Sequence, residues 1–495
     1  MSNNNSAIVS KVWAFCQTLR DDGVGYGDYL EQLTYLLFLK MAHEYSQPPH
    51  NRKLSIPEEY NWESLLNKSG SELEGHYTLL LRELGHQKAV LGQIFTKSQN
   101  KIQDPAKLYK LIMMINAENW VMMGVKDKGD IYEGLLEKNA EDTKSGAGQY
   151  FTPRPLIQAM VACIQPKPMK TIADPACGTG GFFLAAYDWI ESQNKLDKEE
   201  REFLKYRTFK GNEIVASTRR LALMNLFLHN IGDIDSDNLI SPNDSLIADS
   251  GERFDYILAN PPFGKKSSMT FTNEAGEQER DDLTYNRQDF WVTTSNKQLN
   301  FVQQIKTMLK TSGEAAVVLP DNVLFEGGVG ETVRKKLLET TNLHTILRLP
   351  TGIFYANGVK ANVLFFDGRP SSKDPWTKET WIYDYRTNIH HTLKKNPLKL
   401  DDLKDFIDCY QPGNIHKRKE VYSDANPEGR WRKFTYDEII ARDKTSLDIS
   451  WLKDKSLADL DNLPDPDVLA LEIVENIEAG LESFKAIIAS LNKQN

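Results

Sequence analysis

The sequence predicts an α/β protein with a doubly wound, mostly parallel sheet, a helical N-terminal domain and a helical C-terminal tail. Helical periodicity dominates the first part of the chain, and short apolar runs then alternate with helical stretches. At the end of the chain, apolar residues recur at three- and four-residue steps. We therefore expect a helical domain at 1–142, an α/β domain at 143–370 and a C-terminal region at 371–495.

The composition is that of a globular protein and excludes several classes. Of 495 residues, 40% are hydrophobic and 26% are charged, so we expect little disorder. The net charge of -9 argues against a surface that binds nucleic acid everywhere, but it allows a local basic groove. The four cysteines and nine histidines are scattered, so no disulfide framework and no metal site are expected. Without a leader or a membrane-length apolar stretch, the sequence predicts a cytoplasmic protein that contacts no membrane.

The N-terminal domain is predicted from two helical patterns and from the linker that follows them. Residues 28–45 and 108–120 both place apolar side chains at helical spacing. The segment TKSGAGQYFTPRP, at 143–155, combines glycines and prolines as a linker does. We expect the helical domain to end there.

The α/β domain is predicted from six apolar runs and three helical stretches. This alternation is typical of a mostly parallel sheet with helices on both faces. The expected strands are 171–173, 208–211, 256–259, 315–319, 344–348 and 362–366. The expected helices are 181–192, 217–229 and 299–309.

The C-terminal region is predicted to be polar and irregular from about residue 370, until one long amphipathic helix at 465–493. The apolar face of that helix needs a partner. Packing inside this chain and docking on another protein are equally compatible with the pattern.

A glycine-rich turn follows the first expected strand in TIADPACGTGGFF, at 171–183. The strand ends at Asp174, and Gly178, Gly180 and Gly181 precede the next helix. Glycines let a backbone turn tightly and approach a ligand closely. An ordinary glycine turn that binds no ligand is the alternative. The downstream residues decide between a ligand-binding turn and an ordinary one.

Two acids at later strand ends favour an adenosyl ligand. Glu213 ends the second strand, where a carboxylate can accept both hydroxyls of a ribose, and Asp244 stands where it can meet an adenine amine. In a nicotinamide dinucleotide site, the acid follows the glycine motif by ~20 residues, and Glu213 lies farther from the glycines than that. For Asp244, an ordinary Asn-Asp turn is an equal alternative.

The segment ANPPFG, at 259–264, predicts a receptor for a flat base that carries an amino group. The following proline restricts Asn260 to extended geometry, so its side-chain carbonyl and the Pro261 carbonyl can accept from one amine. Phe263 can stack on the ring. An amine whose two N–H bonds are accepted in this way could attack a methyl sulfonium. Positioning and electrostatics would be the main contributions to catalysis. A rigid strand-end turn with a core phenylalanine is the alternative.

These motifs resemble those of S-adenosylmethionine-dependent amino-methyltransferases. The order DPACGTGG, Glu213, Asp244, NPPF carries the likeness. With GAGQYFTPRP upstream and TSNKQLNF downstream, the chain resembles the modification subunit of type I restriction–modification systems, of the N6-adenine DNA methyltransferase family. The resemblance implies a Rossmann-like methyltransferase sheet and a target adenine flipped out of duplex DNA.

The resemblance also implies residue roles. The target-adenine site would be Asn260, Pro261, Pro262 and Phe263. The cofactor, S-adenosylmethionine, would be held by Gln149, Tyr150, Phe151, Thr152, Pro153, Arg154, Asp174, Gly178, Thr179, Gly180, Gly181, Glu213 and Asp244. For Thr152 and Arg154, capping a helix that starts at Pro155 is an alternative role.

The implied partners are double-stranded DNA and other subunits. In the family, two methyltransferase subunits join one specificity subunit that selects the DNA sequence, and an endonuclease/translocase subunit completes the restriction enzyme. The 465–493 helix would dock on the specificity subunit. Lys265 and Lys266 would contact phosphates, or lie in an ordinary solvated loop. Methylation of RNA or protein, a non-catalytic scaffold and a nicotinamide-dependent oxidoreductase are the competing hypotheses.

Overall fold

The computed structural model describes most of the chain between residues 14 and 455. The described residues are 14–15, 18–19, 23–49, 51, 55–120, 132–136, 151–233, 239–264, 268–272, 278–282, 284–354, 359–393 and 395–455. One compact unit comprises residues 1–386 and 390–450, and a second comprises 387–389 and 451–495. The predicted helix at 465–493 lies outside the described residues. No helix of the described residues is long and apolar enough to span a membrane.

The N-terminal part is helical, as predicted. Its longest helix, α2, buries most of its side chains, including Tyr29, Leu33 and Phe38, so it forms the centre of this part. Asp104 caps α6 by accepting from two backbone amides, and Pro105 occupies the first turn. The helices are α2 (Tyr26–Ser46), η1 (Glu58–Tyr60), α3 (Trp62–Leu66), α4 (Gly70–Leu84), α5 (Ala89–Phe95) and α6 (Pro105–Asn116).

Arg220 fastens these helices to the α/β part. Its buried guanidinium donates to the carbonyls of Ile94, at 2.6 Å, and Thr96, at 2.7 Å, and pairs with Glu31 of α2. Arg220 lies on α11, the helix that follows the predicted cofactor acid Glu213. The junction therefore connects the N-terminal helices to an element at the predicted site.

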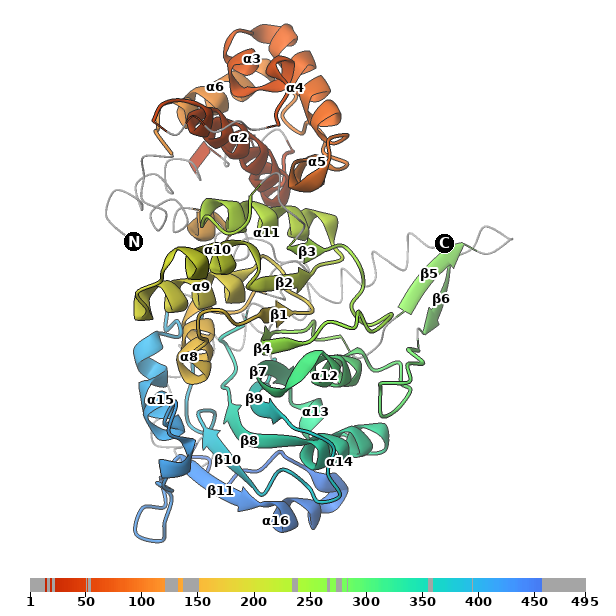
Figure 1. Cartoon of the computed structure of the whole chain (residues 1–495), viewed down its shortest axis with the longest axis vertical. Coiled ribbons are helices and arrows are strands. Elements are labelled where there is room, and N and C mark those ends of the chain that lie inside the picture. The colour runs from red at the N-terminus through yellow and green to blue at the C-terminus, as the bar shows by residue number, and fades with distance from the viewer. Residues whose placement is uncertain are drawn as a thin grey trace, which may run out of the picture. The chain divides into compact units, whose positions relative to one another are not determined.

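A nine-stranded sheet forms the α/β part, in the order β11-β10-β8-β9-β7-β4-β1-β2-β3 (Figure 1). All neighbouring strands pair in parallel except β9, antiparallel to both neighbours, and the β10–β11 pair. The strands are β1 (Ile172–Asp174), β2 (Phe209–Asn212), β3 (Ile240–Ser241), β4 (Phe254–Ala259), β7 (Leu309–Pro320), β8 (Thr341–Arg348), β9 (Ala361–Gly368), β10 (Glu379–Asp384) and β11 (Trp431–Thr435).

Helices lie on both faces of the sheet, so the fold is doubly wound. Figure 1 shows α8 and α15 on one side of the central strands and α12, α13 and α14 on the other. The helices are α8 (Arg154–Ile164), α9 (Gly181–Gln193), α10 (Lys198–Tyr206), α11 (Ala216–Leu228), α12 (Lys297–Met308), α13 (Asn322–Phe325), α14 (Val329–Thr340), α15 (Lys404–Tyr410) and α16 (Tyr436–Ile440). Short 3-10 turns are η3 (Leu400–Leu403), η4 (Ile415–Lys417) and η5 (Asp443–Thr445).

The six predicted strands and three predicted helices are all present, with ends shifted by a few residues. Continuous apolar runs identified them because strands covered on both faces bury nearly every side chain. Other elements were not predicted, among them strand β3 and helices α10, α13 and α14. Strands β10 and β11 extend the sheet beyond residue 370, where an irregular region was expected. The segment 264–298, for which no helix or strand was predicted, contains a two-stranded hairpin, β5 (Ser268–Thr272) with β6 (Gln278–Asp282).

Candidate functional site

The sheet reverses its strand order between β1 and β4. From β1 the chain continues to β2 and β3 on one side, and then crosses to β4 on the other. In open α/β sheets, ligands bind at the carboxyl ends of the strands at such a switch point. The motif residues Asp174, Glu213 and Asn260 all stand at this edge, at the ends of β1, β2 and β4.

The glycine turn after β1 is shaped by two left-handed residues. Gly178 has φ of +54° and Gly180 has φ of +83°, a region that other residues rarely adopt. The Cys177 amide donates to the carbonyl of Asn212 at 2.9 Å, which ties the turn to the end of β2. Helix α9 begins at Gly181, so its first amides face the strand ends.

Asp174 lies beneath this turn and is almost fully buried. Its Oδ1 accepts from the Ala176 amide at 2.9 Å. Burial raises the pKa of Asp174 to about 8, the nearby charge of Glu213 adds to the rise, and the Ala176 amide opposes it. A cation placed beside this carboxyl would therefore displace a proton at neutral pH.

Glu213 follows β2 and faces the glycine turn. Its Oε1 accepts from the Val215 amide at 2.7 Å. Burial raises the pKa of Glu213, while the amides of Val215, Gly178 and Ile214 oppose that rise. The structure thus brings together the acid and the glycine turn that the sequence separates by a helix pair.

Asp244 lies in the loop after β3, and both of its carboxylate oxygens are engaged. Oδ1 accepts from the Leu246 amide at 2.9 Å and Oδ2 from the Tyr285 hydroxyl at 2.9 Å. The neighbouring Ser245 hydroxyl donates to the Pro175 carbonyl at 2.9 Å. The Asp244 loop is therefore bound to the glycine turn on one side and to residues after the hairpin on the other.

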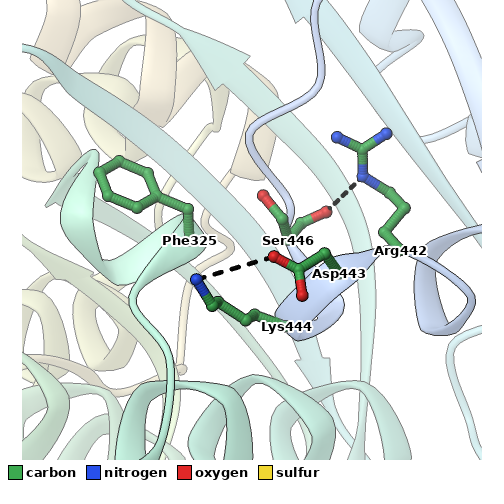
Figure 2. A pocket seen from close by; sticks show the side chains of 5 residues that line it. All are labelled: Phe325, Arg442, Asp443, Lys444 and Ser446. Carbon is green, nitrogen blue, oxygen red and sulfur yellow. Dashed lines mark hydrogen bonds and ion pairs between the residues drawn. The ribbon is translucent and has the colours of Figure 1, made fainter.

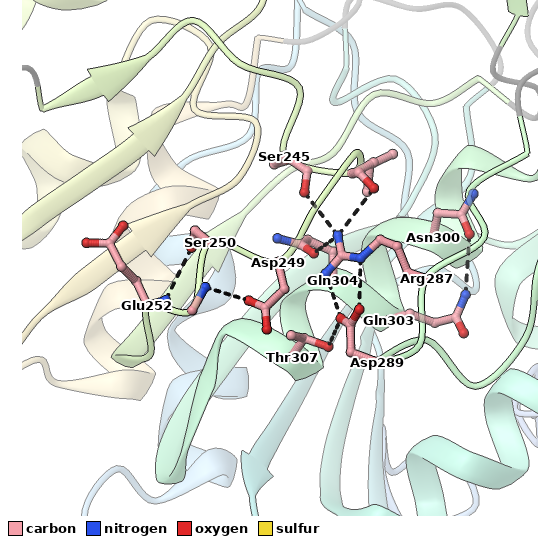
Figure 3. Close-up of polar contacts among 12 residues, drawn as sticks. Ser245, Asp249, Ser250, Glu252, Arg287, Asp289, Asn300, Gln303, Gln304 and Thr307 are labelled. Atoms are coloured by element: carbon pink, nitrogen blue, oxygen red, sulfur yellow. Dashed lines mark hydrogen bonds and ion pairs between the residues drawn. The ribbon is translucent and has the colours of Figure 1, made fainter.

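Arg287 holds the loop that contains Asp244, and Figure 3 shows its guanidinium between Ser245, Gln304 and Asp289. Its Nη1 donates to the carbonyls of Ser245, at 3.3 Å, and Leu246, at 3.2 Å, and to Gln304 of α12 at 2.6 Å. Its other nitrogens form a two-point pair with Asp289, at 3.0 and 2.6 Å. These five residues are the Arg287 network.

Hydrophobic packing supports the same loop. Leu246, Tyr285, Phe290 and Phe301 form a buried cluster against Ala176 of the glycine turn. The Arg287 guanidinium lies over the Phe290 ring, 4.1 Å from its centroid. Residues 285–290, to which the sequence analysis gave no role, thus support the predicted cofactor residues.

On the other side of the switch point, Asn260 is buried and only half satisfied. Its Nδ2 donates to the Thr152 hydroxyl at 2.8 Å. Among the described residues, no group donates to its buried Oδ1. A buried amide oxygen without a donor costs free energy, on the order of 1–3 kcal/mol. The arrangement therefore leaves the Asn260 side-chain carbonyl able to accept a hydrogen bond from a donor outside the chain.

The rest of the predicted target site follows Asn260 in the chain. Pro261 is buried, while Pro262 and Phe263 are half-buried. The Phe263 ring meets the edge of Phe354, with centroids 5.6 Å apart and planes at 90°. This contact sets the orientation of the one aromatic ring that NPPF contributes.

The predicted upstream cofactor segment, 149–154, is described only in part. Gln149 and Tyr150 lie outside the described residues, as do Lys265 and Lys266.

Helix α8 begins at Arg154 after Pro153, with no side-chain cap, so the capping role considered for Thr152 and Arg154 is wrong. Thr152 instead bonds Asn260 and Arg154 pairs with Glu133 at 2.6 Å. Phe151 is half-buried, and the Thr179 carbonyl accepts from Asn225 at 3.1 Å.

Two exposed apolar side chains were missed by sequence reasoning. Ile214 is 58% exposed directly after Glu213, and Ile247 is 67% exposed three residues after Asp244. Large apolar groups beside partly buried carboxylates suit a flat ring with a sugar attached. Their signal in the sequence is an isoleucine just beyond each strand-end acid.

Comparisons with known proteins agree with this geometry. The family model described as N-6 DNA Methylase matches residues 125–450, and that of the HsdM N-terminal domain matches residues 8–115. The chain is 40% identical to the type I restriction enzyme StySJI methylase subunit of Salmonella typhimurium, over 99% of this chain and 96% of that protein. It is 39% identical, with the same coverage, to the EcoKI methylase subunit of Escherichia coli.

Solved structures show the same likeness. The match to the crystal structure of the type I restriction enzyme EcoKI M protein covers 98% of this chain and 96% of that protein's chain. The sequence identity is 34% and the TM-score is 0.54. A chain from a study of complex assembly and conformational transition in a type I R-M system is 24% identical. It matches with a TM-score of 0.72 over 99% of both chains, and this supports the fold.

Proposed function

Because this chain belongs to the N-6 DNA methylase family, as a methylase subunit of the type I restriction kind, we propose how its site carries out adenine methylation. The reaction is transfer of a methyl group from S-adenosylmethionine to the exocyclic N6 of an adenine flipped out of DNA. One observation carries the proposal. The side-chain carbonyl of Asn260 is buried at the carboxyl end of β4, and none of the described residues donates a hydrogen bond to it.

The Asn260 carbonyl is suited to receive the adenine amine. With Thr152 accepting from Nδ2, Oδ1 is left as an acceptor for one N–H of the base. The Pro261 carbonyl would accept the second N–H, and the Phe263 ring would lie against the base. Acceptors on both N–H bonds direct the nitrogen lone pair away from the ring, toward the methyl donor.

The residues around β1 and β2 fit the cofactor, which supplies a methyl group on a positively charged sulfur. Glu213 would accept the ribose hydroxyls, and Asp244 would accept from the adenine amine. Ile214 and Ile247 would cover the two faces of the adenine, since both are exposed beside these acids. Asp174, whose pKa is raised by burial, would face the charged part of the cofactor. Nitrogen attack forms the N–C bond as the C–S bond breaks, and the amine then gives its extra proton to solvent.

A base inside a duplex cannot reach Asn260, so the adenine must leave the helix. We propose that a specificity subunit selects the sequence and holds two copies of this chain, and that an endonuclease/translocase subunit joins for restriction. Two observations support this: the relatives are methylase subunits of type I restriction enzymes, and this chain carries a net acidic charge. Acting on cellular DNA would place the protein in the prokaryotic cytoplasm.

The test is methylation of a genome that has none. The chain would be expressed with the specificity subunit of its system in a methylation-free host, beside an Asn260→Ala variant. We expect N6-methyladenine at one split sequence in the wild type and none in the variant. An unmethylated genome, in cells whose purified complex binds S-adenosylmethionine, would overturn the proposal and favour RNA, protein or a silent scaffold.

A further inference from the structure

A pocket with charged and apolar lining residues lies at the carboxyl edge of the sheet, on the far side of β4 from the predicted cofactor residues. It has a volume of about 420 Å³ and is lined by Phe325, Arg442, Asp443, Lys444 and Ser446. Figure 2 shows the Phe325 ring and the charged side chains around it. We call it the β7-edge pocket, because Phe325 ends the helix that follows β7.

The sheet places this pocket on the same edge as Asn260. β7 runs parallel to β4, with Ala259 opposite Val317, so β7 ends at the edge where NPPF begins. The Leu447 amide donates to the Leu324 carbonyl at 2.8 Å, which fastens the 442–446 segment to α13. The order β7-β4-β1 puts the target-adenine site between the pocket and the cofactor side.

The backbone of the pocket is held in a strained conformation. Lys444 and Thr445 have φ of +53° and +49°, although neither is glycine and Thr445 is β-branched. The buried Arg334 guanidinium stabilises them, donating to the Lys444 carbonyl at 2.6 Å and the Thr445 carbonyl at 3.1 Å. Strain of this kind, about 1–3 kcal/mol per residue, is concentrated at functional sites. A glycine would relieve it at position 444, yet the chain keeps a lysine there.

The neighbouring residues leave room for that lysine. If residue 327 had a Cβ, that atom would lie only 3.2 Å from Lys444 Cδ, which is closer than most such contacts. The glycine at 327 therefore leaves room for the aliphatic part of the Lys444 side chain. The Lys444 side chain is 55% exposed, and its nearest acid, Asp443, is 3.7 Å away and largely exposed. An exposed pair at this distance holds an ammonium weakly. The Lys444 charge is therefore available to a ligand.

The pocket combines positive charge with an exposed aromatic ring. Arg442 uses Nε and Nη2 on the carbonyls of Ser446 and Asp448, and no described residue accepts from its Nη1. Phe325 is 45% exposed, high for a large apolar side chain. Cations bind phosphates and aromatic rings contact sugars and bases, and both are typical of nucleic-acid sites.

We propose that the β7-edge pocket binds the DNA strand next to the flipped adenine. Lys444 and Arg442 contact a backbone phosphate, and Phe325 packs against the adjoining sugar or base. The proposal rests on the proposed function, since it needs DNA at the Asn260 edge. Because phosphate contacts carry no sequence information, the pocket positions DNA and leaves the choice of sequence to other residues.

The test is the salt dependence of DNA binding by the full chain, assembled with its specificity subunit. Lys444→Asn is the main variant, because asparagine tolerates a left-handed backbone and keeps the fold. The dissociation constant would be measured by fluorescence anisotropy over a range of salt concentrations, on target and non-target duplexes. We expect weaker binding to both duplexes. The slope of log affinity against log salt should be shallower by about 0.9 for each phosphate that the variant no longer neutralises.

Two further variants separate the parts of the pocket. Phe325→Ala should lower affinity without changing the salt slope, because it removes no charge. Lys167→Asn is the matched control, an exposed lysine just before β1 at the opposite edge of the sheet, and should change neither quantity. S-adenosylmethionine should bind all three variants as it binds the wild type.

The outcomes distinguish this inference from the proposed function. An unchanged affinity and slope in Lys444→Asn, in a complex that binds and methylates DNA, would overturn the pocket alone. A wild-type complex that neither binds nor methylates DNA would overturn the proposed function, and the pocket proposal with it. A weakening confined to the target duplex would also overturn the phosphate assignment.

Discussion

The two sides of the switch point differ in how their polar groups are satisfied. On the cofactor side, Asp174, Glu213 and Asp244 each accept from the chain's own backbone amides. On the target side, the buried Oδ1 of Asn260 has no donor among the described residues. In the proposed function, the cofactor side (Asp174, Glu213 and Asp244) is preorganised by the fold, whereas the target side (Asn260) is completed only by a substrate. Variants on the two sides should therefore affect different kinetic constants.

The largest effect on the cofactor side is expected from Arg287→Ala. It removes the donor to two loop carbonyls and leaves Asp289 without its guanidinium. Hydrogen bonds to charged groups contribute about 1.5–3 kcal/mol, so the KM for S-adenosylmethionine should rise roughly ten- to a hundredfold, with a smaller change in kcat. Steady-state methylation assays measure both constants.

Arg253→Ala is the matched control for Arg287→Ala. Arg253 makes the same kind of two-point pair with Asp249, at 2.9 and 2.7 Å, but is 38% exposed and contacts no loop carbonyl of the site. A pair so exposed contributes little, so both constants should stay near the wild-type values. Equal cofactor KM values in the Arg287 and Arg253 variants would contradict the positioning role.

On the target side, Thr152→Val should reduce kcat about tenfold. The valine keeps the shape but removes the acceptor of the Asn260 amide, so Oδ1 is no longer held in one orientation. Thr152→Ser, which keeps the hydroxyl, should retain most of the activity. A rise in cofactor KM at unchanged kcat would instead place Thr152 on the cofactor, the role its motif implies.

The raised pKa of Asp174 predicts proton release on cofactor binding. With a pKa of about 8, the carboxyl is mostly protonated at neutral pH, and a bound cation would favour its ionised form. Affinity for S-adenosylmethionine should therefore increase as the pH rises toward 8, by at most about tenfold per unit, and level off above it.

Calorimetry in buffers of different ionisation enthalpy measures this release directly. Near pH 7, the observed binding enthalpy should change with the buffer in the wild type and much less in Asp174→Asn. A wild-type enthalpy that is the same in every buffer would show that the cofactor leaves the Asp174 proton in place.

The smallest effect is expected from Tyr285→Phe. It removes the hydroxyl that donates to Asp244 Oδ2 but keeps the ring in its hydrophobic cluster. Asp244 retains the Leu246 amide, so the dissociation constant for S-adenosylmethionine should rise about threefold. Titration calorimetry would measure it, and an effect as large as that of Arg287→Ala would mean that the hydroxyl holds the whole loop.

The sequence was sufficient for the central strands and for Asn260. Strands such as β4 and β9 are continuous apolar runs, and NPPF constrains its own backbone, so local pattern determined both. Strand β11 was missed because it is short and leaves most of its side chains partly exposed. Strand β10 was missed although five of its six residues are buried.

The contacts that hold the site together could not be predicted. Thr152 and Asn260 are separated by 108 positions, and Arg287 and Ser245 by 42. No periodicity links residues so far apart, and only the folded sheet edge brings them together. The predicted docking helix at 465–493 and the predicted roles of the site residues, Gln149 and Tyr150 included, stay predictions.

The most direct test is single-turnover methyl transfer by Asn260→Ala, with the bound S-adenosylmethionine measured in the same preparation. We predict wild-type cofactor affinity together with a rate of adenine N6 methylation lower by about a hundredfold or more, as when a preorganised hydrogen-bonding group is removed. Transfer at the wild-type rate, or cofactor affinity reduced to the same extent as the rate, would contradict a target side that is separate from the cofactor side.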